Sequence, residues 1–331
     1  MYLPRTLFRY LPLCLLLISI IWFSIFLVRP ISEPSLPIKL NVKNGENWSS
    51  ISPKLVELGI LKSPDSFIFL VKILGKSKKL KAGSYEFNDP PSPFDILTKL
   101  TSGDFAAAKI TFPEGITFKR MRELINSHPY VNHETADISN SDLLNQLKID
   151  STNPEGLFSP NTYNFTAGTS DIVIFELAYQ TQKRMLKKLW PERMDGLPLK
   201  TPYEALILAS IIEKETGVLN EQSKISEVFI NRLKKRIRLQ ADPTVIYGLG
   251  HKFDGNLRKK DLKSDTPYNT YTRYGLPPTP ISLPGENAIK AVLNPTKTGN
   301  LYFVARGDGT HYFSKTLKEH NKAVNKYQRK K

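Results

Sequence analysis

The chain has 331 residues with 47 Lys and Arg against 31 Asp and Glu, a formal net charge of +16. Its length suggests about two domains, and its 40% hydrophobic content excludes a chain that is disordered throughout. The single cysteine, Cys14, excludes internal disulfides and cysteine-cluster metal sites. The five histidines show no HExxH spacing, and no glycine-rich dinucleotide or P-loop motif occurs, which argues against zinc hydrolases and nucleotide-binding enzymes.

The N-terminal segment predicts a transmembrane helix over residues 10–28. It contains 18 consecutive uncharged residues, Leu11 to Val28, that are rich in Leu, Ile and Phe. A helix that spans a bilayer needs about 20 mostly apolar residues, so the run is long enough. It ends in Phe-Leu-Val-Arg-Pro, which fits no signal-peptidase site, so we expect an uncleaved anchor in place of a removed signal peptide.

The charges that flank this run predict its orientation. Arg5 and Arg9 precede it, whereas Arg29 is the only near basic residue after it. Because basic flanks stay on the cytoplasmic side, we expect a cytoplasmic tail at residues 1–9 and a single-pass membrane protein. The rest of the chain then lies outside the cytoplasm, and a proline-rich linker at residues 29–37 lifts it off the membrane.

Basic runs at residues 76–81, 234–236 and 258–260 would suit nucleic acid in a cytoplasmic protein. An exported domain instead meets anionic lipid headgroups and anionic cell-wall polymers. Each run also fits a solvated basic surface without a specific partner. We therefore expect no nucleic-acid partner.

Residues 38–88 predict a small module of order β-α-α-β. Residues 38–42 alternate apolar and polar side chains like a strand, and a short helix follows that ends near Gly59. A second helix begins at Ser63-Pro64-Asp65, because Ser is a good N-cap and Pro suits the first helical position. Residues 82–87 predict the second strand.

A weak internal echo of this module lies 70 residues further along the chain. Both segments predict a strand, a tight glycine turn, an aromatic residue and a helix, and the second copy would occupy residues 108–127. A repeated unit and a coincidence between two ordinary strand-turn-helix starts both explain the echo. The corresponding residues are Leu40, Val42, Gly45, Trp48 and Ile51 in the first segment and Ile110, Phe112, Gly115, Phe118 and Met121 in the second.

Two further elements are predicted beyond this echo. A loop rich in glycine, proline and aromatic residues at 154–163 precedes a long helix at residues 172–189. Near the C-terminus, Gly307-Asp308-Gly309 predicts a hairpin turn between two short strands.

A buried helix that begins at Thr201-Pro202-Tyr203-Glu204 carries the most informative carboxylate, Glu213. A capping box with Pro at the first helical position starts this helix, the uncharged stretch 205–212 forms its body, and Gly217 ends it. Glu213 shares a face with small residues and has no cation three or four positions away, so partial burial would raise its pKa and let it carry a proton near neutrality. The alternative is a structural carboxylate paired with a distant Arg or Lys, and we expect Glu215, on the opposite face, to be structural.

The end of this helix resembles a family signature. Ala209-Ser210-Ile211-Ile212-Glu213-Lys214-Glu215-Thr216 is similar to the signature of the endolytic murein transglycosylase (YceG-like) family. Four further stretches are similar to that family and occur in the expected order, so the resemblance covers nearly the whole chain. Ser159 departs from it, because the family places a Phe before the Pro. The four stretches are Glu155–Tyr163, Leu239–Leu249, Tyr268–Tyr271 with Gly275–Ile281, and Leu301–Ala305.

The resemblance implies an α+β protein that is an enzyme, a lyase acting on peptidoglycan. A single N-terminal transmembrane helix would be followed by a small LysM-like sugar-binding module at residues 38–88 and a larger mixed α/β catalytic domain at residues 89–331. The implied reaction is endolytic cleavage of the β-1,4 bond between N-acetylmuramic acid and N-acetylglucosamine with formation of a 1,6-anhydro end, which terminates the elongation of nascent glycan strands. By resemblance Glu213 is the catalytic acid/base, and no metal or organic cofactor takes part.

Side chains that hold the sugar are predicted in two of the similar stretches. Polar and aromatic groups there could bind sugar hydroxyls or stack on pyranose rings, or they could serve only turn chemistry and core packing. The candidates are Gln240, Asp242, Tyr247, Asn269 and Tyr271. The implied partners are peptidoglycan glycan strands and the membrane, with peptidoglycan synthases as further candidates. The resemblance also implies a protein of the bacterial inner (cytoplasmic) membrane whose catalytic domain faces the periplasm.

Two other functions remain open on the sequence. A muramidase-like hydrolase would use Glu213 and Asp242 as its two carboxylates, and its product would be heavier than that of the lyase by one water. A non-catalytic cell-wall-binding membrane anchor would use only residues 38–88, and turnover of glycan strands would exclude it.

Overall fold

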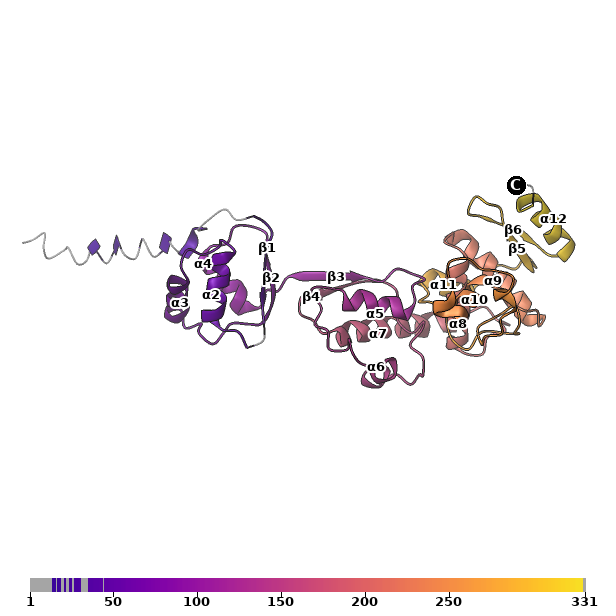
Figure 1. Cartoon of the computed structure of the whole chain (residues 1–331), viewed down its shortest axis with the longest axis horizontal. Helices are drawn as coiled ribbons and strands as arrows, with labels where there is room; N and C mark the ends of the chain where they lie inside the picture. Colours follow the sequence, from indigo (N-terminus) through magenta and orange to yellow (C-terminus); the bar gives the residue numbers. More distant parts are fainter. Residues whose placement is uncertain are drawn as a thin grey trace, which may run out of the picture. The chain divides into compact units, whose positions relative to one another are not determined.

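The computed structural model describes residues 35–43 and 45–329 and, nearer the N-terminus, residues 14–15, 17–18, 21, 24–25 and 27–30. Most of the predicted transmembrane helix and part of the predicted linker therefore lie outside the described residues. Among those that are described, no helix is both long enough and apolar enough to cross a membrane. The described chain combines many helices with three two-stranded sheets, which confirms the predicted α+β class (Figure 1).

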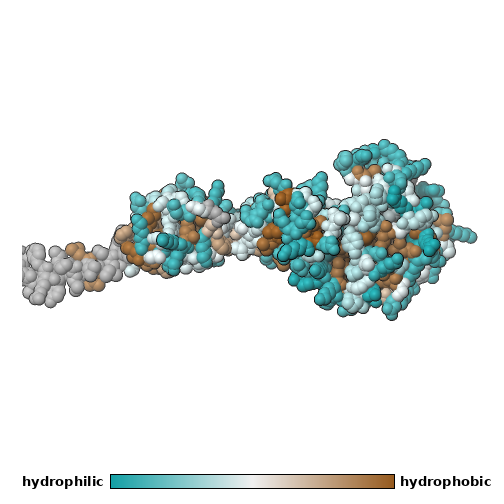
Figure 2. All heavy atoms as spheres, turned by 90° about the horizontal axis from the view of Figure 1, so that it is seen from below, coloured by the Kyte–Doolittle hydropathy of each residue, from teal (hydrophilic) through white to brown (hydrophobic). Residues whose placement is uncertain are grey.

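The described residues form two compact units. The first runs to Ala108 and takes in Asn164–Thr169, and the second comprises Lys109–Tyr163 and Ser170–Lys331. Each unit has its own buried hydrophobic cluster. On the face drawn in Figure 2, hydrophilic residues predominate and hydrophobic ones appear in separate patches between them.

The first unit contains the predicted β-α-α-β order. Strand β1 (Ile38–Val42) is followed by α2 (Trp48–Glu57), α3 (Pro64–Ile73) and β2 (Gly83–Phe87). The two strands pair antiparallel, and alternate residues of β1 are buried, as the sequence predicts. Helix α4 (Pro93–Ser102), which the sequence analysis did not assign, packs its apolar face into the same core. The compact unit thus extends past residue 88.

The segment from β3 to β4 repeats the order strand, helix, helix, strand. Strand β3 (Ala107–Thr111) is followed by α5 (Phe118–Asn126), α6 (Asn140–Gln146) and β4 (Thr162–Thr166), and β3 pairs with β4. The predicted strand, glycine turn and helix are all present, with Gly115 at φ 77°. The chain passes from one unit to the other within these two strands. Whether the two segments are copies of one unit stays a hypothesis.

The core of the second unit surrounds α8 (Pro202–Glu215). Its residues 205–212 are all buried, which confirms the burial predicted from the uncharged stretch. Helices α9 (Leu219–Lys234) and α11 (Glu286–Leu293) pack against α8 and against each other (Figure 1). The predicted long helix is α7 (Asp171–Leu189).

The remaining elements of this unit are short. The predicted hairpin is formed by β5 (Tyr302–Ala305) and β6 (His311–Ser314), which pair antiparallel. The other elements are α10 (Asp242–Leu249), α12 (Leu317–Tyr327) and single turns of 3-10 helix at Trp190–Glu192, Gly250–Lys252 and Asp261–Lys263.

Two local predictions for α8 are wrong. The Thr201 side chain caps the helix by accepting the Glu204 N–H at 3.2 Å, but the Glu204 carboxylate accepts the Lys200 N–H instead of closing a capping box on Thr201. The helix ends at Glu215 with an extended residue after it, and Gly217 lacks the positive φ of a glycine C-cap. Neither difference moves Glu213 out of the last turn of the helix.

Candidate active site

Hydrogen bonds between α8 and the segment before α11 place Glu213. The Ser210 hydroxyl accepts the Ile281 N–H at 2.9 Å, and the Ser282 hydroxyl donates to the Ser210 carbonyl at 3.1 Å. These three residues are buried, so their polar groups satisfy each other's hydrogen bonds in place of water. The segment is thereby fixed beside the last turns of α8, and Gly285 lies at the Glu213 carboxylate.

The surroundings of Glu213 suit a group that gains and loses a proton. The side chain is half-buried, and its Oε2 accepts the Gly285 N–H at 2.9 Å. It has no ion-pair partner in the part of the chain that the structure describes, and the Lys214 ammonium donates to the Gly115 carbonyl instead. Burial, reinforced by the negative charge of Glu114, raises the pKa of Glu213, while the Gly285 N–H and Lys214 oppose that rise. The direction agrees with the prediction from the sequence.

Glu114 is a second carboxylate at this point, and the sequence pattern did not predict it. A Cβ atom on Gly285 would lie 1.8 Å from the Glu114 Oε1, so the Glu114 carboxyl group rests against the residue whose N–H holds Glu213. The Glu213 Oε2 and the Glu114 Oε1, which both lie against Gly285, are therefore no more than about 7 Å apart. Gly285 has an extended backbone that any residue adopts, so this close approach is what requires glycine there. The one signal in the sequence was the position of Glu114 next to the turn glycine of the internal echo.

Three of the predicted sugar contacts meet at the start of α10. The Tyr271 hydroxyl donates to the Asp242 carboxylate, and the Gln240 N–H donates to the Thr270 carbonyl at 3.1 Å. Gln240 is exposed at φ 53°, a left-handed conformation that costs a residue with a Cβ about 1–3 kcal/mol and often marks functional sites. Asp242 is the first residue of α10, so this group lies at the N-terminus of that helix.

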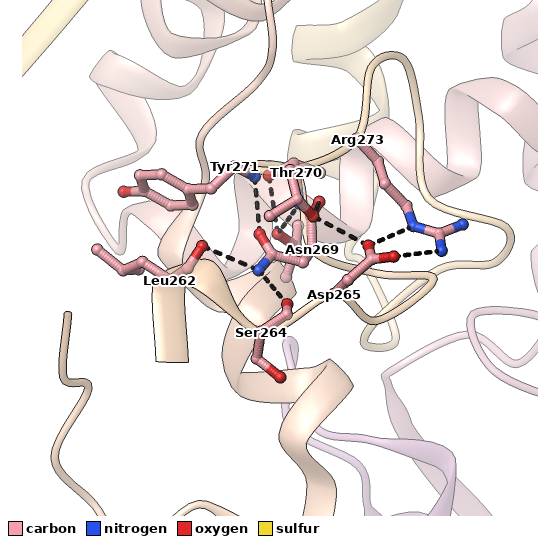
Figure 3. Close-up of polar contacts among 9 residues, drawn as sticks. Leu262, Ser264, Asp265, Asn269, Thr270, Tyr271 and Arg273 are labelled. Carbon is pink, nitrogen blue, oxygen red and sulfur yellow. Dashed lines mark hydrogen bonds and ion pairs between the residues drawn. The ribbon is translucent and has the colours of Figure 1, made fainter. Parts of the chain in front are cut away.

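Asn269 has a structural place in the loop that precedes Tyr271. It is fully buried, and its amide nitrogen donates to the carbonyls of Leu262 and Ser264 at 3.1 and 2.6 Å (Figure 3). Its amide oxygen accepts the Tyr271 N–H at 2.8 Å. The side chain therefore holds this loop together, which is the turn role that the sequence offered as the alternative to a sugar contact.

Tyr247 is likewise engaged inside the protein. Its hydroxyl donates to Glu155 at 3.0 Å, and its ring packs edge-on against Tyr268 with centroids 4.8 Å apart. Glu155 is buried and also accepts the Phe118 N–H at 2.8 Å. Burial raises the pKa of Glu155 to about 7 against these hydrogen bonds. The Glu155 carboxyl group thus connects its own loop to α5 through the Phe118 N–H and to α10 through the Tyr247 hydroxyl.

Glu215 differs from Glu213 in its neighbours. Its Oε1 is buried and has no hydrogen-bond partner among the described residues. Burial, followed by the negative charge of Asp242, raises the pKa of Glu215 to about 8, and Arg232 opposes the rise. The negative charge of Asp242 thus raises the pKa of Glu215, whereas the negative charge of Glu114 raises the pKa of Glu213. The contacts give no support to a catalytic pair of Glu213 with Asp242.

A cleft of about 430 Å³ lies beside Glu114. Glu114 is one of its lining residues, and the C-terminal half of α7, the loop at 159–161 and the start of α11 supply the others. Its volume lies in the range of roughly 300–1,000 Å³ that is usual for small-ligand sites. A ligand in this cleft would touch the carboxylate that flanks Glu213.

Comparison with known proteins identifies the family. The profile of the YceG-like family matches residues 40–326. The chain belongs to the YceG-like family. A relative from Bacillus subtilis (strain 168), named endolytic murein transglycosylase, is 34% identical over 319 residues, which cover 91% of this chain and 88% of the relative.

Two further relatives and a crystal structure agree with this YceG-like membership. Proteins of the same name from Streptococcus pneumoniae strains D39 and R6 are 28% identical over 322 residues; the match covers 87% of this chain but only 58% of their length. The crystal structure of a yceG-like protein from Listeria monocytogenes is 32% identical and similar in fold, with a TM-score of 0.54 over 86% of this chain and 98% of that one.

We expect Glu215→Gln to stabilise this YceG-like protein at neutral and alkaline pH. A carboxyl group with a folded pKa of about 8, against an ordinary 4.5, holds its proton in the folded state and loses it in the unfolded state between those values. Stability of the wild type should therefore fall as pH rises through this window, and the neutral amide should remove that fall. Thermal unfolding from about pH 4 to about pH 9 measures this. Equal declines in Tm for both proteins would contradict a buried, protonated Glu215.

Proposed function

We propose that this chain is an endolytic peptidoglycan lytic transglycosylase, a lyase, and that Glu213 is its single catalytic acid/base. The proposal rests chiefly on the setting of Glu213, a half-buried carboxyl group held by one backbone N–H and free of ion pairs within the described residues. The names of the Bacillus and Streptococcus relatives support murein as the substrate. The stretch 209–216, which resembles the signature of the YceG-like family, contains Glu213.

The first step needs Glu213 in its protonated form, which its raised pKa favours. Glu213 donates this proton to the bridging oxygen between N-acetylmuramic acid and N-acetylglucosamine. The bond from the anomeric carbon to that oxygen breaks, N-acetylglucosamine leaves with a new hydroxyl, and positive charge develops at the anomeric carbon. The Gly285 N–H stabilises the carboxylate that Glu213 has become.

The second step returns the proton. The Glu213 carboxylate takes the proton of the muramic acid 6-hydroxyl while that oxygen attacks the anomeric carbon of the same sugar. A 1,6-anhydro ring forms, Glu213 is protonated again, and no water is consumed. Because the nucleophile belongs to the reacting sugar, its effective concentration is high and no second carboxylate is needed to activate water.

Glu114 assists as a positioning residue. Its negative charge beside Glu213 favours the protonated form of Glu213 before the first step. The same charge also stabilises the cation that develops at the anomeric carbon. Glu114 has no hydrogen-bond or ion-pair partner in the described part of the chain, so its charge is not neutralised there.

Gln240, Asp242 and Tyr271 are the proposed contacts to the glycan strand. Gln240 and Asp242 are exposed, and Asp242 acts on Glu215, which lies two residues from Glu213. The strained backbone of Gln240 is the best support for a functional role here.

Residues 38–88 are proposed to form a LysM-like module that captures glycan, and residues 89–331 to form the catalytic domain. The order of β1, α2, α3 and β2, with the two strands paired antiparallel, supports the first assignment. In this arrangement the module adds affinity for the strand, while the chemistry depends on α8.

Residues 10–28 are proposed to anchor the protein in the bacterial cytoplasmic membrane, with residues 1–9 in the cytoplasm and the catalytic domain outside. The uncharged run and its preceding arginines support this. The anchor would hold the enzyme beside newly made glycan, where cleavage terminates strand elongation and where peptidoglycan synthases are candidate partners.

Glu213→Gln should fold normally and bind glycan but lose on the order of 10²-fold or more in rate, because an amide cannot donate and recover the proton. Mass spectrometry of fragments from purified peptidoglycan measures this, since 1,6-anhydro ends are lighter by one water than hydrolysis products. Glu215→Gln is the matched control on the same helix and should keep most activity. Anhydro ends formed by folded Glu213→Gln protein at near wild-type rate would refute the proposed role, and hydrated ends from the wild type would indicate a hydrolase.

Glu114→Gln should shift the pH dependence of the rate. The wild-type rate falls as pH rises past the pKa of Glu213, because the first step needs the protonated acid. Removal of the neighbouring negative charge lowers that pKa, so the fall should occur at lower pH in the variant. Initial rates across the pH range measure the shift, with Glu286→Gln as a control that removes another carboxylate of the same cleft. An unchanged pH profile with a lower rate would leave Glu114 a purely structural part.

The membrane anchor predicts the side on which the C-terminus lies. A reporter that is active only outside the cytoplasm should work when fused after residue 331, and a reporter that is active only in the cytoplasm should not. Detection of a mature N-terminus beyond residue 30 in protein extracted from cells would show removal of the segment and contradict the anchor.

A further inference from the structure

Two basic side chains line the cleft that Glu114 also lines. Arg184 and Lys188 are exposed and lie one helical turn apart on α7, so they project from the same face of that helix. Neither has an ion-pair partner in the ranges that the structure describes. The Arg184 guanidinium donates to the Thr181 hydroxyl, also a lining residue, at 3.3 Å. Both cations are thus available to a ligand in the cleft.

The cleft is connected to the proposed catalytic acid through Glu114 and Gly285. Glu114 lines it, and the carboxyl group of Glu114 rests against Gly285, whose N–H holds Glu213. Glu286, the first residue of α11, lines it too. A sugar whose anomeric carbon reacts at Glu213 would therefore have its substituents within reach of this space.

We propose that this cleft binds the peptide substituent of N-acetylmuramic acid, and that Arg184 and Lys188 hold its carboxylates. The inference rests on the proposed function and names the part of the substrate that is recognised. The muramic acid carries a lactyl group, and the short peptide attached there bears carboxylates. A guanidinium matches a carboxylate with two parallel hydrogen bonds, and an ammonium one turn away supplies a second charge.

The other charges of the cleft favour a peptide over a simple polyanion. Glu114 lines it from outside α7 and has no ion-pair partner among the described residues, so a ligand with negative charge along its whole length would meet repulsion there. Glu286, the other carboxylate of the lining, is paired with Lys290 at 2.8 Å. A peptide places its carboxylates at separate points and carries amides between them. Asn161 also lines the cleft; its amide oxygen accepts the Thr162 N–H at 2.7 Å, while its amide N–H groups can donate to peptide carbonyls.

The decisive experiment compares glycan strands that carry their peptides with the same strands after an amidase has removed them. In full-length protein that carries Glu213→Gln to prevent cleavage, the added pair Arg184→Gln and Lys188→Gln should weaken binding of the peptide-bearing strands on the order of tenfold. The amidase leaves a lactyl carboxylate next to the sugar and removes the carboxylates of the peptide, so binding of the stripped strands should change by less than about twofold. Lys183→Gln is the matched control, because this exposed lysine of the same helix does not line the cleft and lies over the Tyr179 ring.

The same comparison with Glu213 intact gives a second readout that needs no inactive variant. The ratio of kcat/KM for peptide-bearing to stripped strands should fall by a similar factor in the Arg184 and Lys188 variant. Equal losses on both strands, or no loss on either, would overturn the inference, because the cleft would then hold the sugar chain or nothing. Anhydro ends from the wild type in that case would leave the proposed function standing, whereas their absence would count against the function itself.

Discussion

The burial of α8 is the constraint on which the site depends. Residues 205–212 are enclosed by α9, α11 and the segment before α11, so the helix cannot rotate or shift without exposing its core face. The buried Ser210 hydroxyl and carbonyl fix the neighbouring chain through Ile281 and Ser282. Glu213 follows this locked stretch directly, and its carboxyl group therefore has a defined position beside Gly285.

Three carboxyl groups of this unit have pKa values that burial raises, and their partners distinguish what each can do. Glu155 is almost fully buried and is held by two donors, so it serves as an internal tie. Glu215 has a buried oxygen without a partner, which makes its ionised form costly. Glu213 is accessible and has one donor that stabilises its carboxylate, so both of its protonation states are within reach. That combination is what a residue needs when it must act first as an acid and then as a base.

The site is assembled from segments that lie far apart in the chain. Glu114, Glu213 and Gly285 come from three different parts of the sequence, and the cations of the adjoining cleft come from a fourth, α7. Gly285 connects them, since its N–H holds one carboxylate and its missing side chain makes room for the other. An alanine at this position would displace Glu114 without directly removing a polar group, which separates the effect of geometry from that of charge.

The sequence by itself determined several elements and pointed to Glu213 as the proposed acid. The alternation in residues 38–42, the uncharged stretch before Glu213 and the turn at 307–309 each depend on local periodicity or on turn residues, so β1, α8 and the β5–β6 hairpin were predictable. The resemblance of the 209–216 stretch to a family signature pointed to Glu213, and the match of the YceG-like profile agrees with that resemblance.

Only the tertiary structure decided which groups surround that acid. Asn269 and Tyr247 looked like sugar contacts, but their polar atoms are used inside the protein. The sequence suggested Asp242 as a second carboxylate for Glu213. In the structure the charge of Asp242 affects Glu215, and the carboxylate whose charge affects Glu213 is Glu114. Such pairings could not be predicted, because the distance between two charges depends on how the helices pack and not on their separation along the chain. Periodicity places a side chain on a face of its helix, while packing alone decides what that face meets.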